Sequence, residues 1–381
     1  MDIIKMFEEI DCMSEEYIGF WRDICSIESE SGDISALNSV ADSISTFAQR
    51  QGFGVHRQVF DKAGDFLTVE LNEGAEKGYA FLAHMDTVHK KAKFVYPRVK
   101  ISGDIMTGPG VIDCKGGIAV ALLAMKALAK NGYDRHTRLI LTSDEEVSNT
   151  FSGQDGIDFI IKNAKGFNGA FNCEVGVDGE ALVARKGILR LKVRITGKAS
   201  HSGISYFDGI SAIREAAYKI IELEKMSVSD GVTYNCAIIS GGEAANIIPA
   251  YCEFTVDIRV KTLDEMQCAY DTVQNIAAHS FVDGTSSNIE VISRRPPLVL
   301  TEENIGLYTK LEAVASEYKL EKLNMAESGG GSDSAYTQMA GVPTVCGLGT
   351  TGAFCHTPKE YASVRSLSGR AKLLAAVCAK N

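Results

Sequence analysis

Residues 79–86 read Tyr79-Ala80-Phe81-Leu82-Ala83-His84-Met85-Asp86. The first five are apolar and predict a buried strand, which is followed by a histidine and an aspartate. Ligands of open α/β sheets bind at the carboxyl ends of strands, where a neutral imidazole can hold a divalent metal. A carboxylate two residues further along can orient that ring. A solvated turn is the alternative for an isolated pair of this kind, so the interpretation depends on the rest of the chain.

Helix and strand patterns alternate around this stretch. Apolar residues recur at helical spacing from Ser35 to Gln51, and an Ala- and Leu-rich helix is expected at Gly116–Lys130. Strand-like runs occupy 66–71 and 139–142. This alternation predicts an α/β sheet with helices on its faces.

The pattern changes near residue 185. Strands and helices are then expected in the order β-α-β-β-α-β, at 187–196, 208–226, 232–240, 250–260, 263–280 and 288–293. This order fits a small ferredoxin-like α+β unit, closed by Pro296-Pro297. We therefore predict a first domain in two parts, 1–184 and 296–381, interrupted by an inserted domain at 185–295.

Length and composition narrow the classes of function. A chain of 381 residues is too long for one ordinary core, and 45% hydrophobic with 23% charged residues is typical of a globular protein. A net charge of −10 argues against nucleic-acid binding, which needs a basic face. No stretch approaches ~20 consecutive apolar residues, so we expect no membrane contact.

The cysteines and the first residues of the chain indicate the cellular compartment of the protein. The ten cysteines form no Cys-x-x-Cys pair and suit small buried side chains in a reducing compartment. The first nine residues carry acids where a signal peptide would need a basic region and a long apolar core. We expect a cytoplasmic protein.

Four further segments carry carboxylates or a histidine near predicted strand ends or helix starts. Asp113 lies in a glycine-rich loop, Glu145 and Glu146 end the acidic run 144–146, Glu174 follows a short apolar run, and His356 lies in a glycine-rich loop. Taken singly, Asp113 could be a helix N-cap, the acidic run a solvated turn, and His356 a surface residue. Adjacent carboxylates such as Glu145 and Glu146 could divide their roles, one binding a metal and the other activating a water. Two imidazoles and three carboxylates then remain as ligands, a set that suits Zn²⁺, and also Co²⁺ or Mn²⁺. Five ligands with one shared carboxylate make a two-metal site.

The ordered set of motifs resembles the M20 family of metallopeptidases, and within it the glutamate carboxypeptidase (carboxypeptidase G2) type. The resemblance covers nearly the whole chain. It is carried by His84-Met85-Asp86-Thr87-Val88, Gly108 to Gly117, Asp144-Glu145-Glu146, Gly197 to Gly203, Asn246-Ile247-Ile248-Pro249, Asp257-Ile258-Arg259 and Gly329 to Tyr336. It implies an α/β fold with a zinc-peptidase-like catalytic domain, which is a mixed sheet with helices on both faces. It also implies that the inserted ferredoxin-like α+β domain is a dimerisation domain, and hence a homodimer.

The resemblance also implies roles for individual residues. Two Zn²⁺ ions per chain would be held in a site whose ligands are His84, Asp113, Glu146, Glu174 and His356. His84 and Glu174 would bind one ion, Glu146 and His356 the other, and Asp113 both. Asp86 would support His84, and Glu145 would be the general base that takes a proton from a water and delivers it to the leaving amine. The family's cis peptide would fall at Asp113–Cys114.

Further candidates lie in and beside the insert. His201 resembles a histidine that reaches the partner subunit's site and polarises the scissile carbonyl, and a surface loop residue is its alternative. Asn246 and Arg259 resemble substrate-holding groups, and a guanidinium matches a carboxylate in shape; an outward-facing salt bridge is the alternative for Arg259. The backbone of Gly330 and Gly331 is expected near a substrate carboxylate.

The predicted function is a metallocarboxypeptidase that cleaves an amide bond next to a free carboxylate and releases a C-terminal amino acid. An N-acyl-amino-acid deacylase or a di- or tripeptidase of the same family is the alternative, and a non-catalytic binding protein on the same fold is the alternative from another class. The segment 174–180 lacks the lysine that the carboxypeptidase G2 pattern places nearby, so a preference for C-terminal glutamate does not follow.

Overall fold

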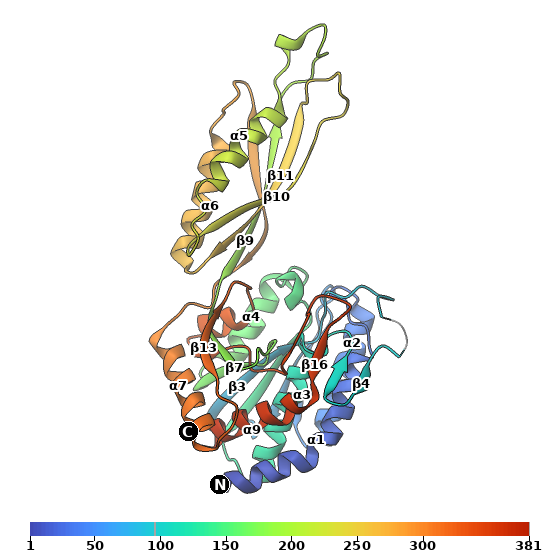
Figure 1. Cartoon of the computed structure of the whole chain (residues 1–381), viewed down its shortest axis with the longest axis vertical. Helices are drawn as coiled ribbons and strands as arrows, with labels where there is room; N and C mark the ends of the chain where they lie inside the picture. The colour runs from blue at the N-terminus through green and yellow to red at the C-terminus, as the bar shows by residue number, and fades with distance from the viewer. Residues whose placement is uncertain (95–96, 381) are drawn as a thin grey trace. The chain divides into compact units, whose positions relative to one another are not determined.

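The computed structural model describes residues 1–94 and 97–380, which form two compact units. The first unit comprises Met1–Ala184, Leu300–Glu327 and the residues from Asp333 onward. The second comprises Arg185–Val299 and Ser328–Ser332, and the predicted insert at 185–295 falls within it. Each unit has a hydrophobic core of its own. Figure 1 shows the helices and strands of the chain.

A mixed six-stranded sheet is the centre of the first unit, with the strand order β1-β2-β6-β3-β7-β14. Strands β6, β3, β7 and β14 run parallel, whereas β1 and β2 are antiparallel to their neighbours. Their bounds are β1 (Gly54–Gln58), β2 (Phe66–Leu71), β3 (Lys77–His84), β6 (His136–Thr142), β7 (Gly169–Asn172) and β14 (Thr344–Val345).

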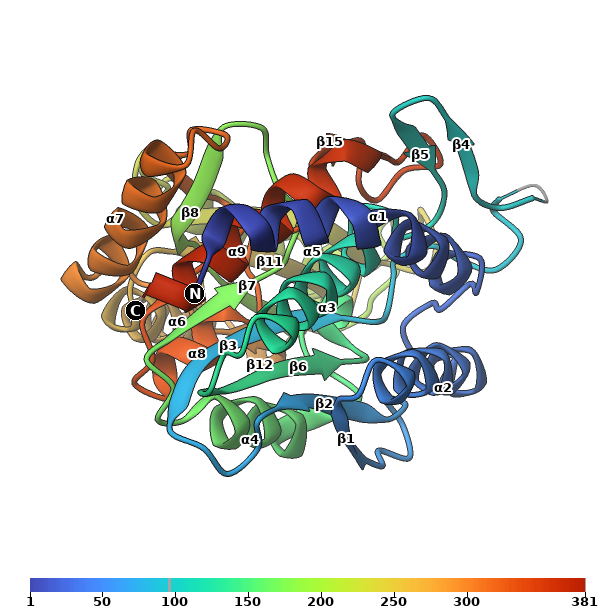
Figure 2. The ribbon, with the colours of Figure 1, turned by 90° about the horizontal axis from the view of Figure 1, so that it is seen from below.

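Helices cover both faces of this sheet (Figure 2). Phe81 of β3 packs in the main core with α1, α3 and α9, while its neighbour Leu82 packs in a second cluster with α4 and α8. Both faces are therefore buried, as the continuous apolar run predicts. The helices are α1 (Ile3–Cys25), α2 (Ile34–Arg50), α3 (Lys115–Lys130), α4 (Gly153–Ala164), α7 (Glu302–Glu317), α8 (Ser334–Met339) and α9 (Val364–Lys380).

Two smaller sheets were not predicted. One has the order β15 (Gly352–Ala353), β16 (Tyr361–Ser363), β5 (Ile105–Thr107), β4 (Lys100–Ser102). The other pairs β8 (Glu180–Arg185) with β13 (Asn324–Ser328). The strands of the first of these sheets have two or three residues and are too short to show an alternating pattern, so sequence periodicity does not reveal them.

The second unit has the ferredoxin-like order that the sequence predicts, in an antiparallel sheet arranged β10-β11-β9-β12. Residues of α5 and α6 pack with β9 and β11 in its core. The expected helix at 208–226 begins later, at Ala212, because the Ser211 side chain caps it by accepting from Arg214 N. The bounds are β9 (Gly187–Thr196), α5 (Ala212–Glu224), β10 (Thr233–Gly241), β11 (Tyr251–Val260), α6 (Leu263–Ala278) and β12 (Ser286–Arg295).

Within the described ranges, every helix is too short or too polar to cross a bilayer.

Candidate metal centre and active site

Three adjacent parallel strands deliver predicted site residues to one edge of the central sheet. His84 is the last residue of β3, Glu145 opens a 3-10 turn, Glu145–Val147, soon after β6, and Glu174 lies two residues beyond β7. The ladder aligns His84 with Thr142 of β6. Because parallel strands end at the same edge, residues distant in the sequence meet there.

Asp113 lies between the two predicted histidine ligands. Its Oδ1 is 3.1 Å from His84 Nε2, and its Oδ2 is 3.0 Å from His356 Nε2. Glu174 Oε1 is 3.6 Å from His84 Nε2, and Glu146 Oε2 is 3.3 Å from His356 Nε2. The five predicted ligands therefore form one cluster, with Asp113 shared between its two halves.

The glycine-rich loop before α3 allows this close approach. Gly110 has φ +69°, and a Cβ there would lie 2.7 Å from Thr87 Cγ2. A Cβ on Gly117 would lie 1.8 Å from the carbonyl oxygen of Cys173, so this glycine lets α3 reach the chain beside Glu174. The peptide Asp113–Cys114 is cis, as the resemblance predicts. The N-cap position of α3 is Cys114, so the helix-cap alternative for Asp113 is wrong.

Asp86 is buried behind the cluster and contacts several of its members. Its Oδ1 is 3.2 Å from His84 Nδ1, and its carboxylate accepts from the backbone N–H groups of Glu145 (3.2 Å) and Glu146 (3.1 Å). Ser31 Oγ donates to Asp86 Oδ2 at 2.6 Å. One carboxylate thus orients the His84 ring and also fixes the backbone of both glutamates.

The buried carboxylates of the cluster need a positive charge beside them. Burial, and then repulsion by Asp113, raise the pKa of the Glu146 carboxyl well above its usual value. Burial alone would raise the pKa of Asp113, but hydrogen bonds from His356 and His84 lower it instead. Hydrogen bonds to Asp113 and Glu146 raise the pKa of His356 to about 11. Without a metal, protons on the imidazoles would balance the carboxylates.

An orphaned oxygen tests whether a metal fits. Glu146 Oε1 is buried and has no hydrogen-bond partner within residues 1–94 and 97–380. Such an atom costs free energy unless a ligand binds it. Imidazole and carboxylate donors are the ligands of zinc, cobalt and manganese sites. His84, Asp113 and Glu174 could hold one ion, and Asp113, Glu146 and His356 another.

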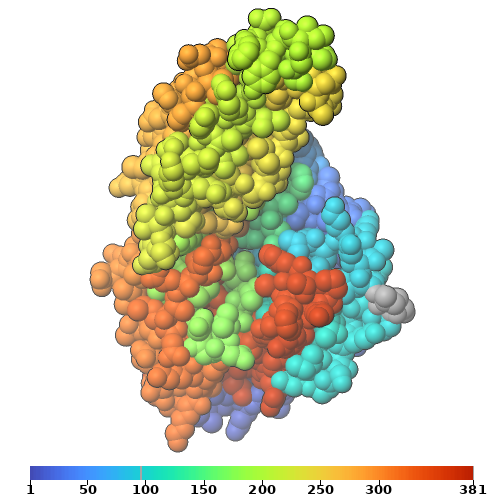
Figure 3. Space-filling view, turned by 45° about the horizontal axis from the view of Figure 1, so that its top comes forward, coloured from blue at the N-terminus to red at the C-terminus, as the bar shows by residue number. Residues whose placement is uncertain are grey.

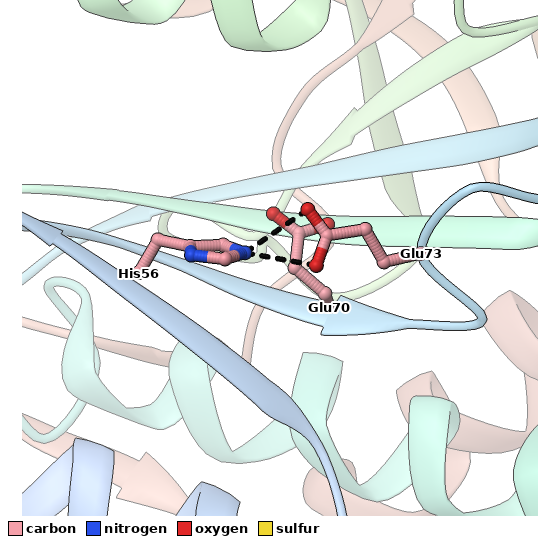
Figure 4. A group of neighbouring side chains, drawn as sticks. All are labelled: His56, Glu70 and Glu73. Carbon is pink, nitrogen blue, oxygen red and sulfur yellow. Dashed lines mark hydrogen bonds and ion pairs between the residues drawn. The ribbon is translucent and has the colours of Figure 1, made fainter.

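A second group of His and Glu residues has a different character (Figure 4). His56 Nε2 lies 3.0 and 2.9 Å from the two carboxylate oxygens of Glu73, and both side chains are largely exposed. Glu70 is buried and accepts from His136 Nε2 (2.6 Å) and Arg138 Nε (2.7 Å). Its charge is already compensated, so we interpret the group as an ion-pair network.

The remaining predicted site residues lie in the second unit and form two groups. Exposed His201 bridges to Ile247, next to Asn246, and the N–H of Ser202 donates to the Asn246 carbonyl at 2.9 Å. Arg259 donates through Nε and Nη2 to Asp257, at 2.6 and 3.3 Å. Its Nη1 reaches the Gly329 carbonyl at 3.5 Å, beside Gly330 and Gly331.

Comparison with known proteins identifies the family. A model of peptidase family M20/M25/M40 matches residues 80–380. The chain belongs to this family. It is therefore a hydrolase of the M20 metallopeptidase type, as the motifs predict.

Known M20 proteins share the chain's sequence or fold. Carboxypeptidase G2 of Pseudomonas sp. (strain RS-16) is 28% identical over 91% of this chain and 85% of its own. A tripeptidase from Staphylococcus aureus has a TM-score of 0.80 at 19% identity, covering 97% of this chain and 99% of its own. An M20 metallo-carboxypeptidase from Sulfolobus solfataricus has a TM-score of 0.78 at 16% identity, covering 95% and 98%. These two likenesses show the M20 fold.

Sequence reasoning missed several residues that hold the predicted site residues. Ser31 holds Asp86, Asp257 holds Arg259, and Glu360 bonds the backbone at Asp113. Asp257 belongs to the motif Asp257-Ile258-Arg259 and could have been predicted from it. Ser31 and Glu360 lie far along the chain from the residues they hold, and their local sequence indicates nothing of these contacts.

Proposed function

We propose that this protein is a di-zinc carboxypeptidase that releases a C-terminal amino acid from a peptide or an N-acyl amino acid. The main support is the pair of imidazoles on the two oxygens of Asp113, at 3.1 and 3.0 Å, with a glutamate beside each. In this proposal His84 and Glu174 hold one ion, Glu146 and His356 the other, and Asp113 both. When bound, such ions polarise a carbonyl and acidify water in the site.

Glu145 is the general base in this proposal. It is 6% exposed and offers an oxygen within 4.8 Å of ligand atoms of His84 and Glu174. Its backbone is fixed by Asp86, so its carboxylate can accept a proton from the attacking water without a large rearrangement. The same oxygen can then protonate the leaving amine.

Arg259 recognises the free carboxylate of the substrate. Asp257 accepts from both Arg190 (2.7 Å) and Arg259 (2.6 Å), so two guanidinium groups share one carboxylate and a net positive charge remains. Arg259 keeps part of its side chain exposed. The backbone of Gly330 and Gly331 lies near the same carboxylate in this proposal; the N–H of Gly330, which donates to Ser328 Oγ at 3.2 Å in the structure, would exchange that partner for the substrate. Asn246 and His201 act on the scissile amide.

The second unit forms the dimer interface in this proposal. Tyr206 and Phe207 are 53% and 96% exposed, and Ile238 and Ile239 are 64% and 54% exposed on β10. Because β10 is the edge strand of its sheet, its apolar side chains and unpaired backbone groups suit pairing with a second copy of the chain. We also propose a cytoplasmic location, because all ten cysteines are free thiols in the described structure.

Metal analysis and a substrate panel test the proposal. The purified chain should contain about two divalent ions by the two-metal logic. A chelator should abolish hydrolysis, and Zn²⁺, Co²⁺ or Mn²⁺ should restore it. Free amino acid should appear from the C-terminal side of peptides or from N-acyl amino acids. Release only from N-acyl substrates would favour the deacylase, release only from di- or tripeptides the peptidase, and full activity in metal-free protein would refute the metal assignment.

A further inference from the structure

Glu360 is a fully buried carboxylate that the proposed mechanism does not use. Its Oε1 accepts from the backbone N–H groups of Ile112 at 3.0 Å and Asp113 at 3.3 Å. Its Oε2 lies 2.6 Å from Nε2 of His89, which is also buried. Three donors therefore converge on this side chain directly behind the shared ligand Asp113.

The same residue anchors the loop that carries His356. Glu360 closes the segment between β15 and β16, four residues after His356. Its carbonyl accepts from Gly108 N at 3.4 Å, and the next residue, Tyr361, pairs with Thr107 of β5. On the surface of the first unit, the C-terminal segment (red) accordingly lies beside residues near 100 (cyan) (Figure 3).

The His356 loop depends on anchors of this kind. Phe354 and His356 have φ values of +61° and +64°. Residues other than glycine rarely adopt this left-handed backbone conformation. His356 lies between β15 and β16, outside the hydrogen bonds of the sheet. The contacts at the end of the loop therefore fix the position of the His356 ring. Glu360 supplies one such contact, and through it the loop is tied to Asp113.

We infer that Glu360 is a positioning residue for the Asp113–His356 half of the metal centre. The inference rests on the proposed metal ligands. Glu360 accepts one hydrogen bond each from the backbone of Ile112 and Asp113. It holds the His356 loop through its own chain, and His89 holds the Glu360 carboxylate in place. Asp86 contacts the His84 ring and the backbone N–H of Glu146, and Glu174 follows β7. In the described structure, Glu360 contacts neither His84 nor Glu174. Loss of Glu360 should weaken the ion at Glu146 and His356 more than the other ion.

Substitutions at Glu360 distinguish the effect of side-chain length from the effect of the negative charge. Glu360→Gln keeps an oxygen for the two backbone N–H groups, and its amide group can donate to His89 in the tautomer that accepts at Nε2. Glu360→Asp keeps the charge but is one methylene too short to contact both sides. Glu360→Ala removes every contact. We expect the zinc affinity of the Glu146–His356 half to fall roughly 10–100-fold in Glu360→Ala and Glu360→Asp, the range for residues that support metal ligands. The loss should be clearly smaller in Glu360→Gln.

Glu70 provides a matched control. It is another buried carboxylate with a histidine Nε2 at 2.6 Å, but its partners are His136 and Arg138 rather than the metal cluster. Glu70→Ala should lower the melting temperature much as Glu360→Ala does, while both zinc affinities stay at the wild-type values.

The experiment is a zinc titration against a chromophoric chelator, with the Co²⁺ visible spectrum as a second readout of ligand geometry. Weakened binding of one ion in Glu360→Asp, with near-normal binding in Glu360→Gln and Glu70→Ala, supports the inference. Wild-type zinc affinities in Glu360→Asp and Glu360→Ala would overturn the inference but leave the proposed function standing. An equal loss of zinc affinity in Glu70→Ala would have the same consequence. If Glu360→Ala does not fold, the Asp and Gln variants decide. A wild-type chain that binds no divalent ion overturns the proposed function and this inference together.

Discussion

Replacing Glu145 with glutamine keeps the size of the side chain but removes its ability to take a proton. The backbone of Glu145 should stay in place, because its N–H bonds to Asp86 at 3.2 Å whatever the side chain. The adjacent Glu146 has a different environment, with Oε2 3.3 Å from His356 and Oε1 buried without a partner in the described residues. The two glutamates should therefore fail in different ways when substituted.

General acid–base catalysis contributes roughly 10²–10⁴-fold to a rate. At 1.36 kcal/mol for each factor of ten, Glu145→Gln should raise the barrier by about 2.7–5.4 kcal/mol. We expect kcat to fall by that factor while two ions per chain remain. Glu146→Gln, the control, should lose one ion.

The assay compares kcat under metal-saturating conditions with metal content from elemental analysis of the same desalted samples. A Glu145→Gln protein that loses an ion, together with a Glu146→Gln protein that keeps both, would refute the reasoning. The roles of base and ligand would then be exchanged between the two residues.

Two further predictions concern the second unit. Removing a charge-assisted hydrogen bond costs ~1.5–3 kcal/mol, so substrates with an amidated C-terminus should have a kcat/KM lower by roughly ten- to 150-fold. Arg259→Ala should erase most of this difference; equal wild-type rates on free and amidated substrates would contradict a carboxylate clamp. In a dimer where His201 serves the partner's site, mixing Glu145→Gln chains with His201→Ala chains should restore part of the activity. Confirmed mixed dimers without any recovery would show that His201 does not act across the interface.

The regular elements could be predicted because their patterns are local. The run 79–83 is apolar throughout, and it became β3, which is buried on both faces. The Ala- and Leu-rich stretch became α3, displaced by one residue at its start. The six elements of the second unit appeared in the expected order. In the second unit the period of apolar residues matches that of the element, whereas β3 and α3 are apolar almost throughout because they are buried on nearly all sides.

The elements that sequence reasoning missed depend on pairing between distant segments. Strand β16 has three residues and pairs with β5, which lies some 250 positions earlier in the chain. Neither strand has an alternating pattern of its own. Their pairing follows from closure of the first unit, in which the C-terminal segment returns to the residues near 105.

The candidate ligands could be named in advance because their motifs are short and carry distinctive residue types. His84 and Asp86, Asp113 among glycines, and the pair Glu145 and Glu146 each stand out within a few residues. That they converge follows from parallel strands that end at one edge. Their distances, the shared use of Asp113, and the orphaned oxygen of Glu146 required the folded chain.

The supporting contacts illustrate what local sequence cannot specify. Glu360 bonds to His89 and to the backbone at Asp113 across separations of 271 and 247 residues. Ser31 bonds to Asp86 across 55. A buried carboxylate must find donors, because leaving it unpaired costs more than folding stability tolerates. Which donors it finds depends on packing of the whole unit, so the composition and motifs predict the chemistry of the centre, while tertiary packing selects the residues that hold it in place.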